Sequence, residues 1–144
     1  WDLAKDRMIL EPAGSKVTSV AWSPNDRVIT TATSHRAIRF LEAETGKELK
    51  LLFGDYENGA QVQFSPDGAW AIVSGDKGIE LWKTDGWTRA DALYGGPGTG
   101  IWVPASFDVA GDGRTLIAGG TLIAKDAPAS GRLSGPVLFW KIRR

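Results

Sequence analysis

The feature of this chain that most constrains its fold is a pattern that recurs at intervals of just over forty residues. An apolar residue, a spacer and an aromatic residue precede a tight polar turn at residues 20–26 (VAWSPND), 62–68 (VQFSPDG) and 105–113 (ASFDVAGDG). The aromatic residue recurs after 42 residues, from Trp22 to Phe64, and after 43 more, at Phe107. A fixed period of this length indicates a repeat architecture. The chain is therefore predicted to consist of three successive units.

Each unit is predicted to contain four β-strands. The Asn-Asp or Asp-Gly turn is typical of a hairpin, and β-rich runs follow it at residues 27–31, 69–74 and 114–118. A third strand follows at residues 38–41, 79–82 and 137–140, and then a polar turn and a more hydrophilic fourth strand. This length and strand number are typical of a propeller blade. The predicted fold class is all-β, with three β-propeller blades of four antiparallel strands.

The predicted blades cover the whole chain, residues 1–144. An outer strand and linker (1–16) precede the successive repeats, which span residues 17–59, 60–101 and 102–144. The innermost strands are expected at residues 17–22, 60–64 and 102–107. Their aromatic residues Trp22, Phe64 and Phe107 are expected to occupy equivalent buried positions, because they have the same offset within the repeat.

Three segments resemble WD repeats: VAWSPNDRVITTAT, VQFSPDGAWAIVSGDKGIELWK and VLFWKI. The resemblance covers essentially the whole chain, with departures. The Trp-Asp ending is complete only at Trp1-Asp2, and the Gly-His pair of the family is missing from all three repeats. The family's buried network of Asp, His, Ser/Thr and Trp therefore cannot form in its usual version. Asp76 matches the network Asp, and His35 occupies the corresponding turn of the first repeat. We expect degenerate blades held mainly by apolar packing.

The resemblance implies a non-catalytic scaffold that binds proteins or peptides. In such propellers one face carries the loops from fourth to next first strand and from second to third strand. The candidate partner-binding residues on these loops are His35, Arg36, Tyr56, Asp76, Lys77, Tyr94, Trp102, Lys125 and Arg132. Aromatic residues and Arg are common at interface hot spots, but such aromatics can equally pack onto the blade edges. The third repeat is longer, and a loop is expected at residues 122–135, either functional or a surface insertion.

Composition argues against most other function classes. Lys plus Arg balances Asp plus Glu at 17 each, so no nucleic-acid or membrane partner is expected. The chain has no Cys and a single His, which argues against a metal site, a cofactor or a catalytic nucleophile. The alternatives are a catalytic or ligand-binding propeller that uses its central channel, and a structural arc within a larger assembly. The first would need carboxylates at first-strand positions held by Val20, Val62 and Ala105.

Closure of the ring needs more than three blades, because propellers have about 4 to 8. One possibility is a homo-oligomer, a two-fold dimer that closes a six-bladed ring, with residues 7–10 of one copy paired to residues 137–140 of the other. The other is that the chain is part of a longer propeller. The sequence leaves the compartment open and favours a soluble, cytoplasmic protein.

Overall fold

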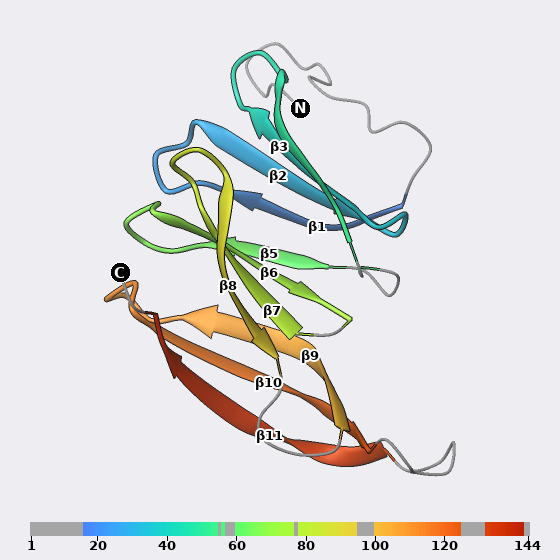
Figure 1. Ribbon diagram of the computed structural model, residues 1–144. Helices are drawn as coiled ribbons and strands as arrows, with labels where there is room; N and C mark the ends of the chain where they lie inside the picture. Colours follow the sequence, from blue (N-terminus) through green and yellow to red (C-terminus); the bar gives the residue numbers. More distant parts are fainter. Residues whose placement is uncertain are drawn as a thin grey trace.

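Every strand that the structure describes belongs to one of three antiparallel sheets (Figure 1). The computed structural model describes residues 16–54, 56, 60–76, 78–94, 100–124 and 132–142. The first sheet, in the order β1-β2-β3-β4, contains β1 (Val17–Trp22), β2 (Val28–Thr33), β3 (Ala37–Glu42) and β4 (Glu48–Phe53). The second, in the order β5-β6-β7-β8, contains β5 (Gln61–Phe64), β6 (Trp70–Gly75), β7 (Gly78–Lys83) and β8 (Thr88–Tyr94). The third, in the order β11-β10-β9, contains β9 (Gly100–Val109), β10 (Thr115–Ala124) and β11 (Arg132–Lys141).

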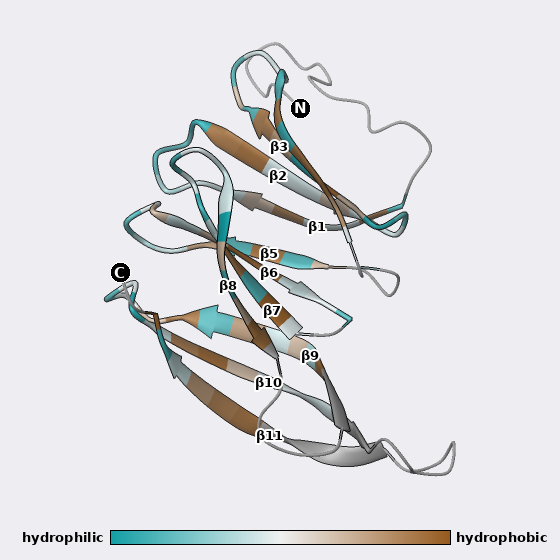
Figure 2. Cartoon of the chain, viewed as in Figure 1, coloured by the Kyte–Doolittle hydropathy of each residue, from teal (hydrophilic) through white to brown (hydrophobic). Residues whose placement is uncertain are grey.

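The three sheets stack face to face as successive blades, which confirms the predicted fold class (Figure 1). The first strands β1, β5 and β9 contact one another in sequence along the stack. Apolar residues recur along the strands of all three sheets, and hydrophilic residues lie in the turns and at intervals along β5, β7, β8 and β9 (Figure 2). In the described part of the chain the third sheet has three strands, so that β11 forms its outer edge.

The hairpin turns fix the register between the three repeats and correct one expectation. The turn is closed by Ser23 N–H donating to Val28 O, and by Ser65 N–H donating to Trp70 O. In the third repeat Ala110 N–H makes the equivalent bond to the carbonyl of Thr115. The residue before the turn is therefore Trp22, Phe64 or Val109, and the prediction that Phe107 is equivalent was wrong by two residues. The reason is that β9 continues through Val109 before it turns.

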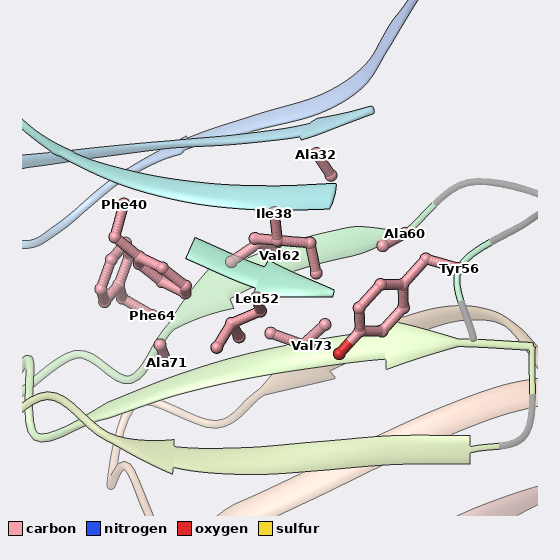
Figure 3. Close-up of a cluster of buried hydrophobic side chains, with 10 residues drawn as sticks. All are labelled: Ala32, Ile38, Phe40, Leu52, Tyr56, Ala60, Val62, Phe64, Ala71 and Val73. Atoms are coloured by element: carbon pink, nitrogen blue, oxygen red, sulfur yellow. The ribbon is translucent and has the colours of Figure 1, made fainter. Parts of the chain in front are cut away.

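Apolar packing between successive sheets forms the core. Ten buried residues fill the first interface, between the first and second sheets (Figure 3): Ala32, Ile38, Phe40, Leu52, Tyr56, Ala60, Val62, Phe64, Ala71 and Val73. Within it the rings of Phe40 and Phe64 meet edge to face, with centroids 6.4 Å apart. The second interface holds Trp70, Ile72, Ile79, Leu81, Val109, Leu116, Ala118 and Ile142. The second sheet therefore buries both of its faces, whereas the first and third sheets each bury one.

The expected burial of Trp22 was also wrong, since 57% of this residue is exposed. Phe64, at the same register position, is 7% exposed because its face of the second sheet packs on the first. Trp22 points to the outer face of the first sheet, where no other described sheet stacks. The same side-chain position is thus buried or exposed according to the neighbouring blade.

The extra length of the third repeat differs from the loop expected at residues 122–135. Part of it lengthens the β10–β11 hairpin, in which Leu122 pairs with Leu133 and Ile123 with Arg132. Additional ladder hydrogen bonds and apolar β-branched residues favour strand over loop here. Residues 125–131 lie outside the described residues.

Candidate functional site

One end of the stack, which we call the loop end, is formed by the strand ends that flank the connections expected to bind partners (Figure 1). These connections join β2 to β3, β4 to β5, β6 to β7, β8 to β9 and β10 to β11. The turns β1–β2, β3–β4, β5–β6, β7–β8 and β9–β10 lie at the opposite end (Figure 1). This alternation follows from antiparallel order, because each strand reverses the direction of the chain.

His35 and Arg36 occupy the β2–β3 turn and are both exposed. Arg36 has a φ of 61°, a left-handed conformation that is uncommon for residues other than Gly, Asn and Asp. The turn backbone is held in place, since the carbonyl of Arg36 accepts a hydrogen bond from Gly54 N–H at 3.2 Å. The Nδ1 atom of His35 lies 3.5 Å from Ser34 Oγ. The turn thus presents an imidazole and a guanidinium on an ordered backbone.

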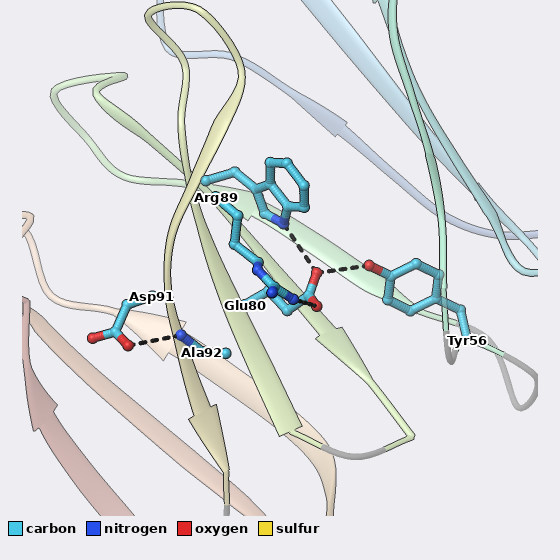
Figure 4. A network of polar contacts seen from close by, with 6 residues as sticks. Tyr56, Glu80, Arg89, Asp91 and Ala92 are labelled. Atoms are coloured by element: carbon cyan, nitrogen blue, oxygen red, sulfur yellow. Dashed lines mark hydrogen bonds and ion pairs between the residues drawn. The ribbon is translucent and has the colours of Figure 1, made fainter.

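Tyr56, in the β4–β5 connection, is buried, with 4% of its surface exposed. Its hydroxyl donates a hydrogen bond of 2.8 Å to Glu80 Oε2 (Figure 4). Its ring lies so close to Gly54 that a Cβ added there would be 2.9 Å from it. Tyr56 therefore packs between two blades, which is the alternative that the sequence left open for loop aromatics.

The carboxylate of Glu80 accepts hydrogen bonds from three donors, and the sequence analysis did not single out this residue. Besides Tyr56, Trp82 Nε1–H donates to Oε2 at 3.0 Å and Arg89 donates to Oε1 at 3.2 Å (Figure 4). The Glu80 side chain is 24% exposed. The available signal was an acidic residue inside an otherwise apolar third strand, Ile79 to Trp82. Glu80 thus accepts the indole N–H of Trp82 and, through Tyr56, connects the segment after β4 to the second blade.

The remaining candidate residues are only partly described. Asp76 is half-buried in the turn after β6. The backbones of Tyr94, Trp102 and Arg132 lie on β8, β9 and β11, whereas their side chains are outside what the structure describes. Lys77 and Lys125 lie outside the described residues. The structure therefore places His35, Arg36 and Asp76 at the loop end, whereas Tyr56 lies in the core.

Asp112 has a structural role in the β9–β10 turn, at the end of the stack opposite the loop end. Its Oδ1 accepts the backbone N–H of Arg114 at 2.8 Å and that of Thr115 at 3.1 Å. The hydrogen bond from Arg114 is the main reason that the pKa of Asp112 lies below its usual value. These bonds stabilise the β9–β10 turn, and the residue is accounted for without a bound cation.

A cleft of about 280 Å³ opens between the second and third sheets. Trp70, Leu81, Ala90, Asp91, Leu93, Trp140, Lys141 and Ile142 line it. Leu81 corresponds in register to Phe40, on which the ring of Trp87 lies at a centroid distance of 4.4 Å in the first interface. The cleft therefore lies at the position that Trp87, an aromatic residue of the β7–β8 turn, covers in the first interface.

Metal coordination and a membrane-spanning helix have no candidate group among the described residues. Among them, no group of three or more His, Cys, Asp or Glu side chains is placed to hold a metal ion. No helix in the described part of the chain is long and apolar enough to cross a membrane.

Comparison with known proteins gives two family matches and a structural neighbour. Residues 7–65 match the family model of the anaphase-promoting complex subunit 4 WD40 domain, and residues 52–83 match that of the WD domain, G-beta repeat. Hydrazine synthase from Kuenenia stuttgartiensis is similar in structure, with a TM-score of 0.67 and 19% identity. The alignment covers 87% of this chain but 34% of that one, and this likeness concerns the fold alone. No curated protein sequence matches the chain.

Proposed function

The chain is built of WD-repeat β-propeller blades, and from this premise we propose that it is a non-catalytic scaffold that binds a protein or peptide at its loop end. WD-repeat domains generally mediate protein interactions. The observation that carries the proposal is the β2–β3 turn, where His35 and Arg36 are exposed on a backbone fixed by hydrogen bonds. Because the backbone of this turn is already ordered, ordering it adds little entropic cost when a partner binds.

The first-strand positions support binding over central-channel chemistry. In the register set by the turns, the equivalent positions are Val20, Val62 and Phe107. A channel that held an ion or polar substrate would need convergent polar groups there. Glu80, the acidic residue of β7, has its carboxylate occupied by three donors of the fold itself. Catalytic or ligand-binding use of the channel is therefore the less favoured function.

We also propose that the three blades are an arc of a closed ring. Propellers close with about 4 to 8 blades, so the ring is completed either by a second copy, as a two-fold dimer with six blades, or by further blades of a longer propeller. In both cases the loop end would remain available to a partner.

Selection from a phage-displayed peptide library on the immobilised chain tests the scaffold proposal. We expect enriched peptides, and we expect Arg36→Asn to weaken them by at least about tenfold, the range of an interface hot spot. Asn tolerates the left-handed backbone of this position, so the variant removes the cation without straining the turn. Lys47→Asn is the matched control, because Lys47 is an exposed cation at the opposite end.

Three outcomes would contradict the proposal. The first is that no peptide is enriched above an unrelated domain. The second is that Lys47→Asn weakens the peptides as much as Arg36→Asn. The third is turnover in broad hydrolase or oxidoreductase screens that His35→Ala abolishes.

A further inference from the structure

Large apolar side chains are exposed on both outer faces of the blade stack. On the first sheet, Val20 is 67% and Trp22 57% exposed. On the third sheet, Ile117 is 40%, Val137 61% and Phe139 70% exposed. Residues that alternate with these on the same strands, such as Ala21 and Leu138, pack toward the second sheet. Clustered exposed apolar residues usually mark an interaction surface.

The repeat shows what covers the outer face of the third sheet. Phe139 of β11 has the register position of Phe40 in β3 and Leu81 in β7. Phe40 is 0% and Leu81 is 3% exposed, because the next sheet packs on each of them. Val137 likewise has the position of Ile38, which is 0% exposed. The outer face of the third sheet therefore has apolar residues at the positions that a following sheet covers in the preceding blades.

The complementary face is the outer face of the first sheet. Trp22 has the register position of Phe64, and Val20 that of Val62. Phe64 and Val62 are 7% and 6% exposed, since they insert against the preceding blade. The contact made there is the edge-to-face pair of Phe64 with Phe40, at a centroid distance of 6.4 Å. Both halves of a further blade interface are thus present on one chain, at opposite ends of the stack.

We propose that the outer face of the third sheet binds the outer face of the first sheet of a second copy. Phe139 then contacts the partner's Trp22 as Phe40 contacts Phe64, and Val137 contacts the partner's Val20 as Ile38 contacts Val62. This inference rests on the proposed closure of the ring and specifies the residues that perform it. The contact joins unlike surfaces. Each copy therefore contributes the outer face of its third sheet to one contact and the outer face of its first sheet to another. Two copies have two such contacts available, with six blades in total.

The test is the solution mass of the intact chain, measured by sedimentation velocity over a range of micromolar concentrations. We expect the wild-type chain to associate. Phe139→Asp and Trp22→Asp should each weaken association by about 100-fold, because each would bury an unpaired carboxylate. Both residues are exposed in the single chain, so circular dichroism should show an unchanged fold. Leu49→Asp is the control, since Leu49 is exposed at the β4 irregularity, outside both register sets.

Mixing the two variants distinguishes unlike from like pairing. The Phe139→Asp chain keeps its Trp22 face, and the Trp22→Asp chain keeps its Phe139 face. A one-to-one mixture should therefore recover one contact and sediment as a dimer, although neither variant does so alone. If Phe139 instead contacted the partner's Phe139, the two variants would not form a dimer with each other.

The results that overturn the inference separate it from the proposals on which it rests. A monomeric wild-type chain at all concentrations would refute the second copy and leave further blades of a longer propeller to cover these faces. Association that survives both Asp substitutions would refute the face pairing while leaving closure by copies intact. A mixture that stays monomeric would refute pairing of unlike faces. Peptide binding at the loop end is measured separately through Arg36→Asn, so its failure would not be confused with any of these.

Discussion

Truncation of Phe64 to Ala tests whether contact between blades stabilises this fold. The side chain is 7% exposed and packs in the first interface. Burial of a Phe side chain stabilises by about 1.5–3 kcal/mol, and an edge-to-face pair such as that with Phe40 adds about 0.5–1.5 kcal/mol. Together these predict a loss of unfolding free energy of about 3–5 kcal/mol, which is also the range for Phe truncation in protein cores.

Trp22→Ala provides a matched comparison at the same register position of the preceding blade. Because 57% of Trp22 is exposed, its truncation in the single chain should change the unfolding free energy by only about 0.5–1 kcal/mol. The larger residue is therefore expected to have the smaller effect. This reversal follows from the tertiary structure and would not be expected from side-chain size.

Urea unfolding followed by circular dichroism measures both variants, at protein concentrations low enough that association does not contribute. Phe64→Leu is the conservative control and should lose about 1 kcal/mol, because it retains most of the apolar volume. A loss below about 1 kcal/mol for Phe64→Ala would refute the assigned burial. Equal losses for Phe64→Ala and Trp22→Ala would refute the argument that the neighbouring blade decides the energy of this position.

Three further predictions concern polar contacts and the first interface. Tyr56→Phe should lower the unfolding free energy by about 1–2 kcal/mol, because Glu80 loses one donor; urea unfolding measures this, and no loss would contradict the bond. Asp112→Asn should be less stable than the wild type at neutral pH. Since the pKa of Asp112 is lowered by folding, this difference should shrink as the pH falls below about 4, and a constant difference would contradict the assigned bonds. Trp87→Ala should reduce stability by about 2–4 kcal/mol in the same assay, because the ring covers Phe40, and an unchanged midpoint would contradict this contact.

The sequence was sufficient to predict most of the strands and hairpins, because these depend on local chemistry, but it did not predict the lengthened β10–β11 hairpin. Residues with positive φ, Asp26, Gly68 and Gly113, stand at the same point of each turn, and the alternation on either side sets the strand faces. The register of the third repeat was harder to predict, since Phe107 and Val109 are both apolar and two residues apart. The hydrogen bond of Ala110 to Thr115 and the pairing of Val109 with Leu116 distinguish them.

For the candidate site, the sequence predicted the loop end but not the surroundings of its residues. Tyr56 and Arg36 both appeared as surface candidates, yet Tyr56 is buried with its hydroxyl on Glu80, whereas Arg36 is exposed. Nothing local to Glu80 indicates that three donors from separate segments meet at its carboxylate. Such a network depends on contacts between residues far apart in the chain.

Period, strand pattern and turn residues were thus determined by the sequence, because each depends on neighbours within a few residues along the chain. The tertiary structure alone decided the energetic role of equivalent positions. Trp22 and Phe64 have the same place in the repeat, but only Phe64 has a blade packed against it. Burial depends on what is stacked on a face, and a pattern along one strand carries no information about the next sheet.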